Sequence, residues 1–102
     1  MSVRSVLYIR TKPGRRDEVV ALFERLRVLE QASRQGGFVG SEVQLPVDGD
    51  DLVLVTATWT TPEAYQGWLD NPVRAEMRGD LEPLVVGDPE SRVFEIVETF
   101  AV

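Results

Sequence analysis

The chain has 102 residues, 43% of them apolar and 27% charged, a composition typical of one folded domain and not of a disordered chain. Its formal net charge of −6, with no run of Lys and Arg, argues against non-specific binding to nucleic acids, whose phosphates attract positive surfaces. The absence of cysteine and histidine excludes disulfides, thiolate nucleophiles and cysteine-held metals, and removes the usual general base. With no nucleotide-binding loop either, we expect no metal, haem, flavin or other cofactor.

The sequence contains no pattern typical of a signal peptide or of a membrane-spanning segment. The N-terminus lacks the apolar core of a signal peptide, and no window approaches 18 consecutive apolar residues. We therefore expect a cytoplasmic protein with no membrane partner. No linker or repeat divides the chain, so a single domain over residues 1–102 is predicted.

The first third of the chain predicts a strand and a long helix. Alternation of Leu7 and Ile9 with residues of the other face predicts a strand over residues 3–11. A helix over residues 15–35 follows, ended by Gly36-Gly37. Its apolar stripe recurs at helical spacing and contains Val19, Leu22, Phe23, Leu26 and Leu29.

Two further strands and a tight turn are predicted next. The strand over residues 38–46 would place Val39, Ser41, Val43 and Leu45 on one face. The Asp-Gly pair in the turn at residues 48–51 supplies a positive φ at low cost. The following strand, over residues 52–59, would place Val53, Val55, Ala57 and Trp59 on one face.

The last third predicts two short helices and a strand. The run Thr60-Thr61-Pro62-Glu63 is typical of a helix start, with a possible capping box between Thr60 and Glu63. Asn71-Pro72 starts a second helix in the same way. After a loop, a strand over residues 91–100 is predicted, with Val93 and Val97 opposite in direction to Phe94 and Ile96.

The element order is β-α-β-β-α-β, which predicts an α+β, ferredoxin-like fold with a four-stranded antiparallel sheet and helices on one face. The other face would carry apolar side chains, namely Val6, Tyr8, Val93 and Val97. So short a chain has no element left to cover them. We therefore expect a homodimer packed sheet to sheet.

Aromatic and basic residues gather in one stretch, which contains Trp59, Tyr65, Trp68, Arg74 and Arg78. The two arginines are four residues apart and share a helix face. One interpretation is a binding pocket for a flat anion. The other is that the aromatic residues are core and the arginines face solvent, with Glu82 pairing Arg78.

The same stretch resembles the antibiotic biosynthesis monooxygenase domain, of the dimeric α+β barrel superfamily. The resemblance rests on Thr58 to Tyr65, Trp68-Leu69, Asn71-Pro72 and Ala75 to Arg78, on Val6 to Arg10 with Lys12-Pro13-Gly14, and on Gly36-Gly37-Phe38. It covers nearly the whole chain and implies this fold and a dimer.

Two branches of that family can be compared with this chain. In the haem-degrading branch, a helix histidine and a first-strand asparagine fall at Arg78 and near Leu7. In the cofactor-free branch, which oxidises aromatic polyketide anthrones, the pocket tryptophan, tyrosine and arginine match Trp59, Tyr65 and Arg78. That branch has an asparagine four residues before the tryptophan, where this chain has Val55.

The resemblance thus implies a cofactor-independent monooxygenase acting with molecular oxygen on a polycyclic phenol, anthrone or quinone-type aromatic. It implies catalytic roles for Arg78, Trp59 and Tyr65. The substrate would contact residues of the sheet and of both short helices, namely Trp68, Val55, Leu7, Ile9, Arg74, Met77 and Leu81. Two alternatives stay open: a cyclase or isomerase on the same scaffold, and a non-catalytic dimer that binds a small molecule.

Overall fold

The structure, a computed structural model, describes residues 1–101. Four strands form one antiparallel sheet in the order β2-β3-β1-β4. The elements in chain order are β1 (Val3–Arg10), α1 (Arg16–Arg25), α2 (Val28–Ser33), β2 (Phe38–Gln44), β3 (Leu52–Trp59), α3 (Pro62–Leu69), α4 (Val73–Leu81), the 3-10 turn η1 (Glu82–Leu84) and β4 (Glu90–Glu95). The predicted α+β, ferredoxin-like order is confirmed.

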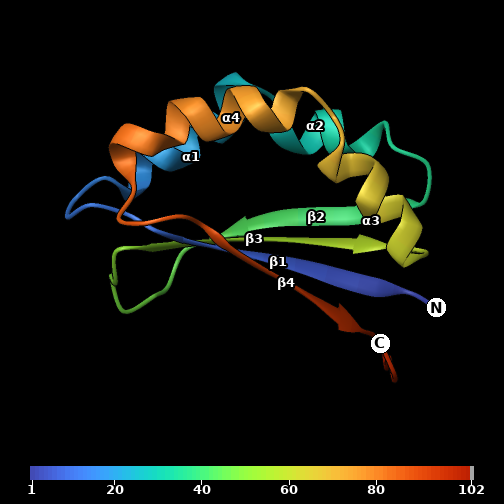
Figure 1. Cartoon of the computed structure of the whole chain (residues 1–102). Coiled ribbons are helices and arrows are strands. Elements are labelled where there is room, and N and C mark those ends of the chain that lie inside the picture. The colour runs from blue at the N-terminus through green and yellow to red at the C-terminus, as the bar shows by residue number, and fades with distance from the viewer. Residues whose placement is uncertain (102) are drawn as a thin grey trace.

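All four helices cover the same face of the sheet (Figure 1). The core lies between the two layers, and its most deeply buried large side chains are Trp59, Ile9, Leu81, Val19 and Val53. On β3 the predicted face is confirmed, because its four residues pair with the residues of β1 that also face the helices. None of the helices in residues 1–101 is long and apolar enough to cross a membrane.

The predicted helix over residues 15–35 is in fact two helices. Arg27 adopts a left-handed backbone conformation, with φ of 52°, between α1 and α2. This break turns the second helix about its axis. Val28 and Ala32 are therefore buried, whereas Leu26 and Leu29 of the predicted stripe are only half-buried.

A β-bulge corrects the predicted face of β2. The register shifts between Phe38 and Gly40, so that Phe38 pairs with Trp59 while Ser41 pairs with Ala57. Phe38 therefore joins Ser41 and Val43 on the helix face, and Val39 is 60% exposed. The extra residue of a bulge changes the side-chain alternation on either side of it.

The predicted face of the last strand is also wrong. Val93 pairs with Ser5, and Phe94 pairs with Arg4. Directly paired residues of antiparallel strands project to the same face. Phe94 therefore lies on the open face of the sheet, and Val93 lies on the helix face. Regular pairing ends at Glu95, so Val97 lies beyond the strand.

Side-chain caps start both short helices. The Thr61 hydroxyl accepts a hydrogen bond from the Ala64 N–H at 3.2 Å, so Thr61 is the N-cap of α3 and the predicted Thr60–Glu63 box does not form. At the start of α4, Asn71 Oδ1 accepts from the Val73 N–H at 3.0 Å. After these starts, α3 lies at the end of the sheet where β3 ends, and α4 runs back above the sheet (Figure 1).

Gly37 packs the start of β2 against α3. It has φ of 83°, and a Cβ there would lie 2.6 Å from Ala64 Cβ and 2.7 Å from the Thr60 hydroxyl. The Thr60 N–H also donates to the Gly37 carbonyl at 2.8 Å. Only glycine satisfies both the backbone conformation and the lack of space.

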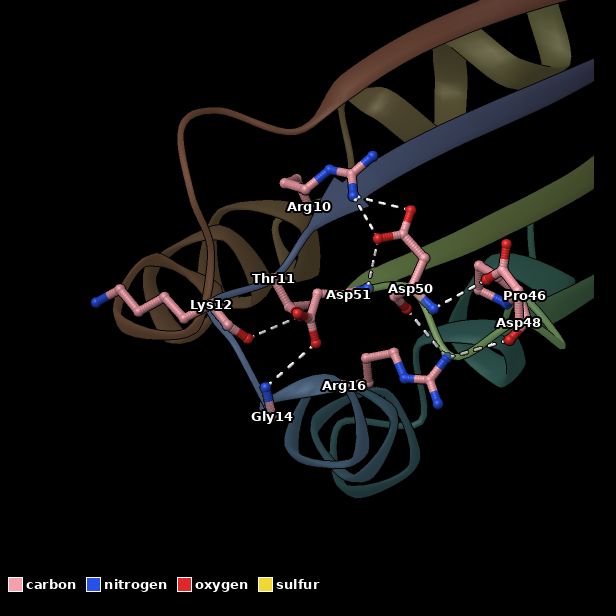
Figure 2. A network of polar contacts seen from close by, with 9 residues as sticks. All are labelled: Arg10, Thr11, Lys12, Gly14, Arg16, Pro46, Asp48, Asp50 and Asp51. Atoms are coloured by element: carbon pink, nitrogen blue, oxygen red, sulfur yellow. Dashed lines mark hydrogen bonds and ion pairs between the residues drawn. The ribbon is translucent and has the colours of Figure 1, made fainter.

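A network of hydrogen bonds and an ion pair joins the turn between β2 and β3 to the end of β1 and the start of α1 (Figure 2). Arg10 Nη1 donates to both carboxylate oxygens of Asp50, at 3.0 Å each. Arg16 donates to the carbonyls of Pro46 and Asp50, and the Asp51 carboxylate accepts from the Gly14 N–H. We call Arg10, Gly14, Arg16, Asp50 and Asp51 the hairpin clamp.

Candidate active site between the sheet and α4

A small cavity lies between the sheet and the helices. Its volume is about 30 Å³, which is room for one or two water molecules. We call this space the inner cavity; its lining consists of Ser5, Leu7, Phe23, Val28, Leu29, Ala32, Ser41, Val55, Ala57, Tyr65, Trp68, Arg74 and Met77. Six residues predicted as site residues from the sequence thus meet here: Leu7, Val55, Tyr65, Trp68, Arg74 and Met77.

A larger hollow opens beside it, between α4 and the start of β4. Its volume is about 290 Å³, which approaches the lower end of the usual range for small-molecule sites. We call it the arginine hollow; it is lined by Leu7, Arg74, Met77, Arg78, Leu81, Asp88, Pro89 and Ser91. Leu7, Arg74 and Met77 border both spaces, so these three side chains separate the inner cavity from the arginine hollow.

Arg74 is the charged group placed deepest in this region. Its guanidinium carbon lies 5.9 Å from the centre of the Trp68 ring, an arrangement typical of a cation–π contact. Burial lowers the pKa of Arg74; the nearby Tyr65 raises it and Arg78 lowers it. Arginine nevertheless stays protonated in proteins. None of the ion pairs within residues 1–101 includes Arg74, and its side chain lines both spaces.

Tyr65 connects the inner cavity to β4. Its hydroxyl is 2.8 Å from the Ser91 hydroxyl, and either oxygen can be the donor. The ring of Tyr65 also lies 6.0 Å from that of Trp59, at an interplanar angle of 49°. The side chain therefore forms one aromatic wall of the cavity and holds the last strand near the helices.

Trp59 and Ile9 lie outside both spaces. Trp59 is fully buried, its Nε1–H donates to the Ser5 hydroxyl at 3.1 Å, and its ring packs edge-on against Phe38 at 5.5 Å. Ile9 is also fully buried. These two predicted site residues are placed in the core, behind the residues that line the site.

Arg78 and Leu81 line the arginine hollow but not the inner cavity. Arg78 is exposed, and Leu81 is buried. The predicted pair Arg78–Glu82 is not among the ion pairs within residues 1–101. The two arginines of one helix face therefore differ in depth, with Arg74 inside and Arg78 at the rim.

Ser5, Asp88 and Ser91 border the site but were not predicted. Ser5 faces the helices with Leu7 and Ile9, and the alternation of the first strand could have indicated it. Ser91 faces the helices because it pairs with Leu7. For Ser91 the register of β4 against β1, which the sequence leaves open, was the missing information.

The donor groups of the site fit an organic anion better than a metal. No cluster of three or more His, Cys, Asp or Glu suited to a metal ion occurs in residues 1–101. The polar groups at the two spaces are guanidinium groups, hydroxyls and the single carboxylate of Asp88. Such a set can hold a negatively charged oxygen against an aromatic wall.

Comparison with known proteins gives a consistent result. A heme oxygenase of the mycobilin-producing type from Mycobacterium tuberculosis is 31% identical over 61 residues, and the match spans 60% of this chain and 58% of that enzyme's length. SnoaB, a cofactor-independent oxygenase from Streptomyces nogalater, superposes with a TM-score of 0.78 at 24% identity, covering 96% of this chain and 95% of that one.

Rv0793 from Mycobacterium tuberculosis superposes with a TM-score of 0.82 at 13% identity, covering 99% of this chain and 100% of that one. At identities of 13% and 24%, the superpositions on Rv0793 and SnoaB show only that the folds are alike. The profile of the family described as antibiotic biosynthesis monooxygenase matches residues 2–79, most of the chain. The chain therefore belongs to the antibiotic biosynthesis monooxygenase family.

Proposed function

We propose that this protein is a cofactor-independent monooxygenase that oxidises a polycyclic phenol or anthrone with molecular oxygen. The observation that carries the proposal is Arg74, a half-buried cation without an ion-pair partner in residues 1–101, stacked on Trp68 beside a cavity. A protein keeps such a charge at the cost of its hydration. An anionic ligand offsets that cost.

The proposed oxidation requires that the protein stabilise the deprotonated substrate, an anion, in a pocket with little water. An anthrone that loses a proton becomes an electron-rich phenolate, which can transfer an electron to oxygen. The Arg74 guanidinium presents several donors to a phenolate oxygen and stays cationic. Tyr65 and Trp68 provide flat surfaces for the rings. Arg78, at the rim, would attract the anion into the hollow.

The reaction balances without a reductant. Oxidation of a ring CH₂ to C=O removes two hydrogens and four electrons and adds one oxygen atom. One O₂ takes up those four electrons, placing one atom in the new carbonyl and the other in water with the two hydrogens. The first proton leaves from carbon to solvent through the arginine hollow, which is open at Arg78 and Asp88.

Haem, which the name of the curated relative implies as its substrate, fits these residues poorly. The chain contains no histidine or cysteine, the side chains that most often hold haem iron. The Tyr65 hydroxyl of the site already bonds to Ser91. The residues present therefore support a phenolic anion as the substrate.

We also propose that two copies pack through the open faces of their sheets. Val6, expected to lack cover within one chain, is in fact buried by its neighbours at 7% exposure. Tyr8, Leu54 and Phe94 lie on the open face, and Phe94 is 38% exposed in the single chain. Apolar area of this kind is stabilised by a second sheet. Light scattering at micromolar concentration should give twice the chain mass, and a monomer mass would contradict the dimer.

Oxygen uptake tests the proposed activity directly. The purified protein is mixed with 1,8-dihydroxyanthrone in air-saturated buffer without reductant, and oxygen consumption is recorded together with quinone formation. We expect one O₂ consumed for each quinone formed, at a rate proportional to protein. The uncatalysed oxidation and Arg34→Met protein, changed at an exposed residue, are the controls.

The two alternative functions give different outcomes. Conversion of the aromatic compound without oxygen uptake would indicate a cyclase or isomerase that uses the same arginine. Binding without conversion would indicate a non-catalytic dimer that holds small molecules. Either result with this substrate contradicts the proposed oxidation.

A further inference from the structure

A second hollow adjoins the inner cavity on the side opposite Arg74 and Arg78. It lies between α1, α2 and the edge strand β2 and has a volume of about 400 Å³. We call it the apolar hollow; its lining is Val20, Phe23, Leu29, Val43 and Leu45, with Glu24, Arg27 and Glu30 also bordering it. Phe23 and Leu29 line the inner cavity as well. The inner cavity therefore lies between the arginine hollow and the apolar hollow.

We propose that the apolar hollow is a second subsite, which receives the uncharged end of an elongated aromatic substrate whose anionic oxygen lies at Arg74. This inference rests on the proposed function for the anionic end. It adds the direction in which the substrate lies and the residues that select its length. The bound molecule would displace Phe23 and Leu29, the side chains between the inner cavity and the apolar hollow.

Charge determines which end of the substrate enters which hollow. The arginine hollow contains Arg74 and Arg78 with one carboxylate, that of Asp88. The apolar hollow contains two carboxylates and one arginine, and Arg27 there already pairs with Glu30 at 3.6 Å. An anion is therefore attracted to the first and repelled by the second.

The dimensions suit a molecule that bridges the two hollows. The arginine hollow borders β1 and β4, and the apolar hollow borders β2. In the order β2-β3-β1-β4, β1 is two strands from β2 and β4 is three, a span of roughly 10–14 Å at the usual strand spacing. The inner cavity alone, at about 30 Å³, is far too small for fused rings.

The helix break supplies an independent indication. Arg27 is the non-glycine residue with positive φ in residues 1–101, and it lies between Phe23 and Leu29. The break ends α1 just after Phe23 and starts α2 just before Leu29, so that both side chains border the same space. Backbone strain of this kind gathers at functional sites.

Calorimetry with two probes tests the proposal without turnover. The probes are 2-naphthoate and 6-propyl-2-naphthoate, which share the anionic head and differ in apolar length. Each buried methylene contributes about a fourfold gain in affinity, so we expect the longer probe to bind at least tenfold more tightly. Leu45→Glu should remove this gain by placing a charge in the apolar hollow. Val47→Glu, fully exposed two residues away, should keep it.

A second variant guards against misfolding of the first. Val20→Trp, at a half-buried residue that lines the apolar hollow but not the inner cavity, fills that hollow and should also remove the gain, while the short probe binds as before. If the longer probe keeps its advantage in either variant, or has none in the native chain, the subsite proposal is wrong. If neither probe binds the native chain, the anion site fails and the subsite with it. If the length gain is present but Arg74→Met changes neither affinity, only the anion site is contradicted.

Discussion

Arg10 and Arg74 show two different uses of the same side chain. Arg10, in the hairpin clamp, is about half exposed and holds both oxygens of the Asp50 carboxylate (Figure 2). Arg74, a residue of α4 that lines the inner cavity, is half-buried and has no ion-pair partner in residues 1–101. The charge at the exposed end of the molecule is neutralised within the chain, and the charge in its interior is not.

The difference separates structural from functional charge. An exposed ion pair contributes little to stability, because water already solvates both partners. A half-buried cation without a partner reduces stability, and that cost is retained where a ligand needs the charge. The hairpin clamp should therefore contribute weakly to stability and nothing to activity, whereas Arg74 should contribute strongly to activity and nothing to stability.

The largest effect is expected from the change Arg74→Met. It removes the donor to the substrate anion but keeps most of the apolar stem, so kcat/KM for the anthrone should fall about 100-fold, or about 3 kcal/mol. Arg10→Met should leave kcat/KM unchanged. Arg74→Lys should restore only part of the rate, because lysine lacks the planar fork.

Steady-state rates and urea unfolding of the same three proteins check this contrast. The midpoint of unfolding should stay the same or rise in Arg74→Met, since an unpaired buried charge is removed. Equal loss of activity in Arg10→Met and Arg74→Met would remove the distinction between the two regions.

The pH dependence of turnover should be the next largest effect. Below the pKa of the bound phenol, kcat should rise tenfold per pH unit and then level off. Arg74 stays protonated throughout, and the chain contains no histidine to titrate between pH 5 and 8. In Arg74→Met the break in the kcat profile should move to higher pH, because the anion loses its counter-charge. A break that stays in place would show that Arg74 does not face the ionising oxygen.

A smaller effect is expected from Tyr65→Phe. The change removes the hydroxyl that lies 2.8 Å from Ser91 and joins α3 to β4. A net loss of about 1 kcal/mol in the free energy of unfolding is typical for one neutral hydrogen bond. In a double-mutant cycle with Ser91→Ala, measured in urea, the two changes should be less than additive. Strict additivity would mean that the bond contributes no stability.

The smallest effect should come from the hairpin clamp under acid. The hydrogen bond from Arg10 lowers the pKa of Asp50 below its usual 3.8. Its contribution to stability is therefore complete above pH 3.8 and disappears as the pH falls through the lowered value. Thermal unfolding should show a small advantage over Asp50→Asn at pH 6 that decreases as the pH falls below 3.8 and weakens in 1 M salt. An advantage that grows on acidification would contradict this assignment.

Much of the fold follows from local pattern, and the exceptions have physical causes. The β3 face from Val53 to Trp59 was predicted correctly because its alternation is uninterrupted. The direction of Val93 was not, because both faces of that segment contain apolar residues and only pairing with β1 fixes the register. The helix break at Arg27 has no glycine or proline to indicate it.

The sequence predicted many of the residues that line the candidate site, but not how deeply each of them is buried. Helical spacing placed Arg74 and Arg78 on one face, and both line the arginine hollow. Spacing alone does not show which arginine lies deeper. Contact with Trp68 of the preceding helix places Arg74 inside. For Trp59, periodicity gives the face but not the side chains packed in front of it, so its core position followed only from the three-dimensional arrangement.

The break at Arg27 also has a consequence for motion. It leaves α2 as a helix of only 6 residues, far too short to be stable on its own. Val28 and Ala32 are its two buried residues, so we expect α2 to open locally more readily than the strands of the sheet. Amide hydrogens of α2 should therefore exchange with deuterium well before those of β1 and β3. In this molecule the segment beside the apolar hollow would open and close far more often than the sheet beneath it.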